Sequence, residues 1–140
     1  MPVPERVPIA YEPNYRTGYV GTWAGGQFMG NVVRKSGGRR SAPWLAYLHE
    51  FDAHGTYLGS RAVAAGTGED GRRTALAMLR GWLNDLSGFA YGDIAIKPFR
   101  AEYDGNVYGL MAADGQGTDR AELHPDRLGF HEPWDGTYST

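Results

Sequence analysis

Cysteine is absent from the 140 residues of this chain. Its absence excludes disulfide bonds, thiolate zinc sites and cysteine nucleophiles, and it fits a reducing compartment. A long apolar run is also missing at the start, where residues 1–10 include three prolines. We therefore expect neither a signal peptide nor a membrane anchor, and we predict a cytoplasmic protein without a membrane partner.

The chain also lacks an excess of charge of one sign. It has 14 lysines and arginines against 16 acidic residues, which gives a formal net charge of -2. Because no global positive field results, nucleic acid is disfavoured as a partner. Hydrophobic residues make up 41% of the sequence. A chain of this length and composition can bury one core, so we predict a single domain over residues 1–140.

Glycine, in contrast, is abundant. The chain has 21 glycines in 140 residues, roughly twice the average frequency in proteins. They fall between apolar runs, where glycine supplies turn conformations. Proline is concentrated in residues 1–17. Because proline fixes its own φ and favours an extended predecessor, we predict a proline-rich extended arm there.

Short apolar and aromatic runs between turn residues predict antiparallel strands. We expect strands at residues 19–23, 27–33, 44–52, 56–65, 93–103 and 106–112. In the third of these runs, Leu45, Tyr47, His49 and Phe51 alternate with other mostly apolar residues. This pattern predicts a strand that is buried on both sides.

Two dipeptides in the second half of the chain carry specific turn information. Asp104-Gly105 favours the positive φ angles of a tight hairpin turn. Lys97-Pro98 interrupts the apolar alternation of residues 93–103. Because proline donates no backbone hydrogen bond, we predict a bulge or an edge position there. The last twenty residues show no clear period, and we expect one short strand near Leu123 and then a surface segment.

One amphipathic helix is predicted at about residues 69–87. Its apolar positions recur at three- and four-residue spacing: Ala75, Leu76, Leu79, Trp82, Leu83 and Leu86. Thr67 or Asp70 can cap its start, and Gly88 can follow its end in the left-handed conformation. The predicted fold class is therefore α+β, with an antiparallel, meander-like sheet of about six strands packed against one helix.

A GxGxxG pattern precedes this helix, from Gly66 to Gly71, and Asp93 lies downstream at the spacing of a ribose ligand. Dinucleotide sites of this type need a parallel sheet with crossover helices, whereas hairpins dominate here. Glu69 and Asp70 would also place carboxylates beside a pyrophosphate. We interpret the pattern as a helix entrance and expect no cofactor.

Two further groups of polar residues favour structural interpretations. Glu50, Asp52 and His54 could supply metal ligands if their strand continued, but residues 52–55 are typical of a hairpin turn. We interpret His49 as a hydrogen-bonded histidine inside the packed sheet.

A basic group is formed by Arg34, Lys35, Arg39 and Arg40. It could contact phosphate. Without interleaved aromatic residues or a basic helix, we interpret it as a solvated hairpin loop.

The densest set of titratable residues lies near the C-terminus and comprises His124, Asp126, Arg127, His131, Glu132 and Asp135. These residue types could support acid and base chemistry. The segment contains neither GxSxG nor HExxH, and its only serine is Ser139. We assign no catalytic or metal residue, and we predict a binding surface formed by His124, Arg127, His131 and Trp134.

Several stretches resemble a family of small bacterial proteins labelled formate hydrogenlyase regulatory protein. They are PERVPIAYEPNYRTGYVG, WLAYLHEFDAHG, YGDIAIKPF and ELHPDRLGFHEPWDGTYST, and together they span most of the chain. The resemblance implies a cytoplasmic regulator that acts through binding, and it implies no catalytic residue.

Three functional hypotheses follow from the sequence. The first is a non-enzymatic cytoplasmic regulatory or protein-binding domain. The second is an immunity or antitoxin-like protein that blocks a toxin, since tight protein partners are often small and rich in aromatic residues. The third is a small enzyme or metal-binding protein that uses the histidines and acids of the C-terminal segment.

Overall fold

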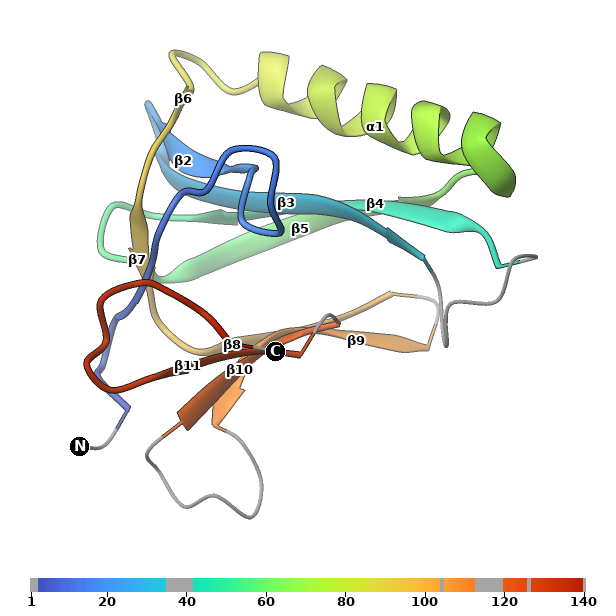
Figure 1. The fold of residues 1–140 in the computed structure, drawn as a ribbon. Coiled ribbons are helices and arrows are strands. Elements are labelled where there is room, and N and C mark those ends of the chain that lie inside the picture. Colours follow the sequence, from blue (N-terminus) through green and yellow to red (C-terminus); the bar gives the residue numbers. More distant parts are fainter. Residues whose placement is uncertain (1–2, 35–41, 104, 113–119, 126, 140) are drawn as a thin grey trace.

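The computed structural model describes residues 3–34, 42–103, 105–112, 120–125 and 127–139. Within these residues one helix and eleven strands form three layers (Figure 1). The elements are β1 (Val7–Ile9), β2 (Val20–Trp23), β3 (Gly26–Arg34), β4 (Trp44–Phe51), β5 (Tyr57–Ala64), α1 (Gly68–Asn84), β6 (Ala90–Tyr91), β7 (Ile94–Ile96), β8 (Phe99–Tyr103), β9 (Asn106–Ala112), β10 (Arg120–His124) and β11 (Leu128–His131).

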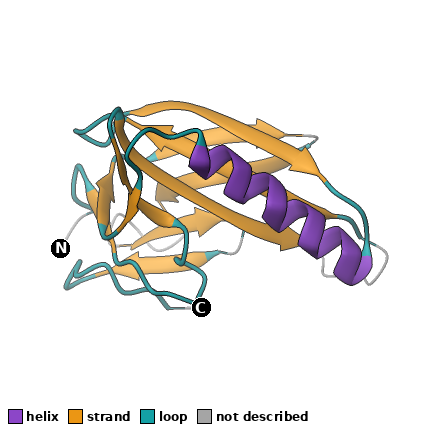
Figure 2. Cartoon of the chain, turned by 90° about the horizontal axis from the view of Figure 1, so that it is seen from above, coloured by secondary structure: helices purple, strands orange, loops and turns teal. Residues whose placement is uncertain are grey.

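The middle layer is an antiparallel sheet of five strands in the order β5-β4-β3-β2-β6. Helix α1 covers one face of this sheet, as the view from above shows (Figure 2). The buried helix residues Ala75, Leu79 and Leu83 pack there against Ala46 and Leu48 of β4. The apolar face of the helix, with its three- and four-residue spacing, thus packs against the apolar face of a strand, with its two-residue spacing.

The opposite face of β4 points towards a second antiparallel sheet, in the order β11-β10-β9-β8. Leu45 and Tyr47 pack against Tyr108 of β9, and Phe51 lies in a core cluster with Leu110. Strand β4 is thus buried on both sides, as its sequence predicts.

The N-terminal arm connects these layers. Its strand β1 pairs with β7 in a separate two-stranded sheet, and Val7 and Ile9 are fully buried. The buried amide of Gln27 fastens β7 to the middle sheet, because it accepts a hydrogen bond from Ala95 N (2.8 Å) and donates one to Ala95 O (3.1 Å). The arm is therefore part of the core.

The predicted α+β class with antiparallel sheets and one helix is confirmed, but the strands form three sheets and number eleven, where the sequence suggested about six in one meander. The predicted strand 93–103 is divided at Lys97-Pro98 into β7 and β8, which belong to different sheets. Because Pro98 lacks a backbone donor, the ladder ends there and the chain changes layers.

The ends of the predicted elements also differ in detail. Helix α1 ends at Asn84, three residues before the predicted end, and Gly88 adopts the predicted left-handed conformation with φ +66°. Thr67 occupies the N-cap position, but its side chain makes no capping hydrogen bond. The expected surface segment after Leu123 contains the further strand β11, in which Phe130 is buried. No helix in the described parts of the chain has the length and apolar character needed to cross a bilayer.

Candidate functional site

The residues of the predicted C-terminal binding surface are divided between two ends of the β10–β11 hairpin. His124 ends β10 and pairs with Gly109, whereas His131 ends β11 and pairs with Arg120 at the other end of β10. Four residues of an extended strand separate these levels, which corresponds to about 13 Å. The structure does not bring the two histidines together.

His124 and Arg127 surround a half-buried carboxylate. The Glu122 side chain is 18% exposed, and its oxygens lie 3.6 Å from His124 Nε2, 3.9 Å from Arg127 Nε and 3.9 Å from Arg120 Nη2. The Arg120 and Arg127 guanidinium groups compensate for the partial desolvation of this carboxylate. Their arrangement is explained by ion pairing within the fold.

His131 and Trp134 belong to the segment that closes the C-terminal end of the fold. His131 Nδ1 lies 2.9 Å from the Glu132 carbonyl oxygen, and Nε2 lies 3.4 Å from Ser139 Oγ. Trp134 packs against the core cluster. The segment is also tied to the arm, because Ala10 N donates to Gly136 O at 2.9 Å. This backbone bond links the C-terminal segment to the N-terminal arm.

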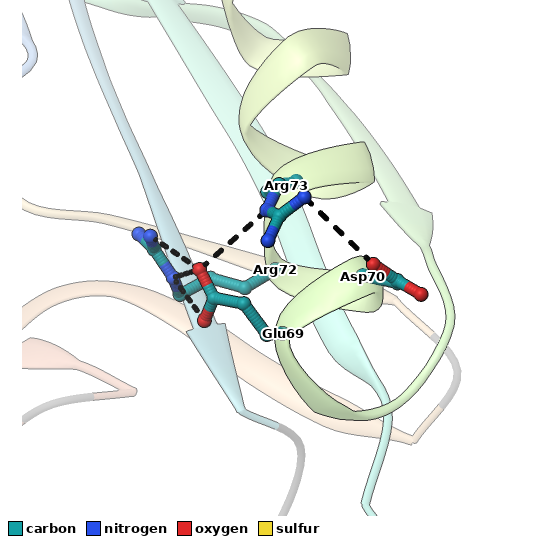
Figure 3. A network of polar contacts seen from close by, with 4 residues as sticks. All are labelled: Glu69, Asp70, Arg72 and Arg73. Atoms are coloured by element: carbon teal, nitrogen blue, oxygen red, sulfur yellow. Dashed lines mark hydrogen bonds and ion pairs between the residues drawn. The ribbon is translucent and has the colours of Figure 1, made fainter.

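Three residues that suggested a nucleotide site, Gly71, Glu69 and Asp93, have structural roles instead. A Cβ on Gly71 would collide with the Gly66 carbonyl, so this glycine permits the close approach of the loop to the helix. Glu69 pairs with Arg72 at 2.9 Å and with Arg73 at 3.8 Å (Figure 3). Asp93, the expected ribose ligand, instead accepts a hydrogen bond from Tyr11 N at 2.8 Å.

The polar residues around the β4–β5 turn are likewise explained by folding. Asp52 Oδ1 accepts hydrogen bonds from the backbone of His54 (2.8 Å) and Thr56 (2.9 Å), which builds the predicted turn and lowers the pKa of this carboxyl. Glu50 pairs with Arg61 at 3.6 Å. Within the described residues, no three histidine or acidic side chains converge as metal ligands.

Buried His49 is hydrogen-bonded, as predicted. Its Nδ1 lies 2.6 Å from Ser60 Oγ, which in turn lies 2.6 Å from the Tyr57 hydroxyl. Of the basic group, only Arg34 lies within the described residues. Its guanidinium lies 5.0 Å from the centre of the Trp44 ring.

A different surface gathers exposed aromatic side chains. A hollow of about 340 Å³, here called the tyrosine cleft, lies between the arm, β6 and α1. Its lining residues are Tyr11, Pro13, Asn14, Tyr15, Gly18, Tyr19, Arg80 and Tyr91. The rings of Tyr11 and Tyr91 are stacked with centroids 5.4 Å apart, and Tyr19 meets Tyr91 edge to face. Burial is the main cause that raises the pKa of Tyr91, so its hydroxyl is protonated at neutral pH.

Tyr15 is the most exposed aromatic side chain in the lining of the cleft, with 69% of its area accessible. Tyr91 follows with 41%. The loop that presents Tyr15 is fixed by its own backbone: Glu12 N donates to Thr17 O, and Tyr15 N donates to Glu12 O. Asn31 Nδ2 anchors the loop from β3 by donating to Arg16 O at 3.3 Å. The backbone that carries the exposed ring is therefore held in place before any partner arrives.

A second hollow adjoins the cleft, and Asn14 and Tyr15 line both. This arginine recess has a volume of about 570 Å³. Its lining residues are Asn14, Tyr15, Arg16, Asn31, Val32, Val33, Arg34, Trp44 and Tyr138. Tyrosine, tryptophan and arginine are the residue types that contribute most energy at protein interfaces.

The sequence patterns did not predict this surface. One signal was present, since Tyr11, Tyr15 and Tyr19 recur every four residues in a proline-containing segment. The other contributors, Arg80 and Tyr91, come from distant elements and are brought to the cleft only by the fold.

Comparison with known proteins adds no relative. No protein-family model matches the chain, and no curated protein or solved structure is significantly similar to it.

Proposed function

We propose that the protein is a non-enzymatic, cytoplasmic regulatory domain that binds another protein through the tyrosine cleft and the arginine recess. The observation that carries this proposal is the exposed ring of Tyr15, which a hydrogen-bonded loop presents between two hollows lined by tyrosines and arginines. A loop backbone that is ordered before binding loses less conformational entropy in a complex.

The distribution of titratable residues supports a binding role over catalysis. His124 and Arg127 are near Glu122, and His131 contacts backbone and Ser139. Buried His49 contacts Ser60, and no carboxylate of the described residues is hydrogen-bonded to it. A general base in a hydrolase is normally oriented by a third group. The regulatory part of the proposal rests on the family resemblance.

Site-specific photo-crosslinking in the native cell tests this function. Replacing Tyr15 by p-benzoylphenylalanine should give a discrete covalent complex with one protein after illumination. Leu58 is the matched control, because it is 58% exposed and lines neither hollow. Absence of a complex from position 15, or the same complexes from both positions, would exclude this surface as a specific interface. A toxin as the captured protein would identify the immunity function.

A further inference from the structure

Building on the proposed function, we propose that the partner inserts an acidic segment, whose carboxylates pair with Arg16 and Arg80. The partner is therefore a protein with aspartate or glutamate beside apolar side chains. The argument rests on the charges that line the two hollows, on the state of these arginines in the free chain, and on the surrounding aromatic groups.

The described lining of both hollows contains three arginines and no acidic residue. Arg80 comes from helix α1, Arg16 from the arm loop and Arg34 from β3. Glu12 is close in sequence but lines neither hollow. Since the chain carries a net charge of -2, this positive surface is a local exception to its overall charge.

Most described arginines outside the two hollows are already paired with carboxylates. Those within 4.0 Å of an acidic side chain are Arg61, Arg72, Arg73, Arg100, Arg120 and Arg127. Within the described chain, neither Arg16 nor Arg80 forms an ion pair. Arg6 also forms none there, but it lies outside both hollows. A partner's carboxylates would supply the missing counter-charges.

The aromatic groups of the two hollows indicate which other side chains the partner segment carries beside its carboxylates. Tyr11, Tyr91 and Trp44 provide flat apolar walls, while tyrosine hydroxyls can donate hydrogen bonds. An extended peptide with acidic and apolar side chains meets both requirements. A nucleic acid would meet them less well, because its many phosphates would also face the acidic remainder of the chain.

Binding of fluorescein-labelled poly-L-glutamate, measured by fluorescence anisotropy with the full chain, tests the charge preference. Combining Arg16→Glu with Arg80→Glu should weaken binding at least about 10-fold at low ionic strength. The matched control combines Arg73→Glu with Arg100→Glu, which changes the net charge equally at exposed positions outside the hollows. It should weaken binding less than about 3-fold.

Three results would overturn the inference: no binding of poly-L-glutamate, equal losses in both double variants, or tighter binding of an oligothymidine of similar length. The segment crosslinked at position 15 provides an independent test, because an acidic sequence supports the inference and a neutral or basic one contradicts it. In the latter case protein binding itself would stand. Absence of any crosslinked protein would instead contradict the proposed function.

Discussion

His49 is a titratable side chain in wholly uncharged surroundings. It is 1% exposed, and the rings of Tyr47, Tyr57, Phe99 and Tyr108 lie within 6.3 Å of its own. Desolvation lowers its pKa from 6.5 to about 3. Because desolvation is not offset by any acidic side chain among the described residues, His49 stays neutral in the folded protein at physiological pH.

The first prediction concerns the pH dependence of stability. Since the pKa of His49 is lower in the folded state, the unfolded chain binds more protons between pH 6.5 and about 3. The free energy of unfolding should therefore fall as the pH decreases through this window. The expected slope is about 1.4 kcal/mol per pH unit. Urea unfolding between pH 7 and about 5 separates most of this effect from carboxylate titration, because the ordinary pKa values of Asp and Glu lie near about 4.

Two variants connect this slope to one residue. His49→Leu should remove most of the slope, although it will also change stability at neutral pH through altered packing. His54→Gln should retain the slope, because His54 is exposed in the β4–β5 turn. An unchanged slope in His49→Leu would show that another group controls acid stability.

The contrast between His49 and the C-terminal histidines shows what residue patterns can predict. Alternation along one strand placed His49 in the core, because the direction of neighbouring side chains is a local property. The density of titratable residues near the C-terminus predicted a shared surface for His124 and His131. The hairpin instead places these two histidines at opposite ends of its length. Proximity across strands depends on register, and register was not encoded in that segment's composition.

At the scale of elements, helix α1 contains one glycine that its conformation does not require. Gly81 is exposed inside the helix, and a Cβ there would meet no atom within 4 Å. The second prediction is that Gly81→Ala stabilises the protein by about 0.5 to 1 kcal/mol, because alanine loses less backbone entropy on folding. Chemical denaturation of the purified variant measures this gain.

Gly88→Ala is the control for this prediction. Gly88 also has open space around its Cβ position, but its φ is +66°. Alanine in that conformation should cost about 1 to 2 kcal/mol. If both substitutions changed stability in the same direction, backbone conformation would not explain the effect.

Elements defined by local signals were predicted well. The three- and four-residue spacing found α1, and Gly105 occupies the β8–β9 turn with φ +77°, while Asp104 lies outside the described residues. The division at Pro98 was predicted only as an irregularity. The assignment of β7 and β8 to different sheets depends on β1. This strand pairs with β7 from more than eighty residues away and so fixes β7 in a separate sheet.

At the scale of the molecule, the candidate binding surface exists only because distant segments meet. The arm loop, β6 and α1 form the tyrosine cleft, whereas β3 and the C-terminal Tyr138 complete the arginine recess. Sequence patterns predict each element separately, but they do not specify which exposed faces become neighbours. The arm is central to this assembly, because it carries the Tyr15 loop and also inserts β1 into the core.

The last prediction is that the arm folds together with both large sheets. Ile9 is fully buried in a cluster that includes Phe51 of the middle sheet and Leu110 of the second sheet. Ile9→Ala should lower the free energy of unfolding by about 2 to 5 kcal/mol, whereas exposed Glu5→Ala should change it by less than about 0.5 kcal/mol. Tryptophan fluorescence and far-ultraviolet circular dichroism should report one common transition. Local loss of the arm with an unchanged main transition would contradict cooperative folding of the three sheets.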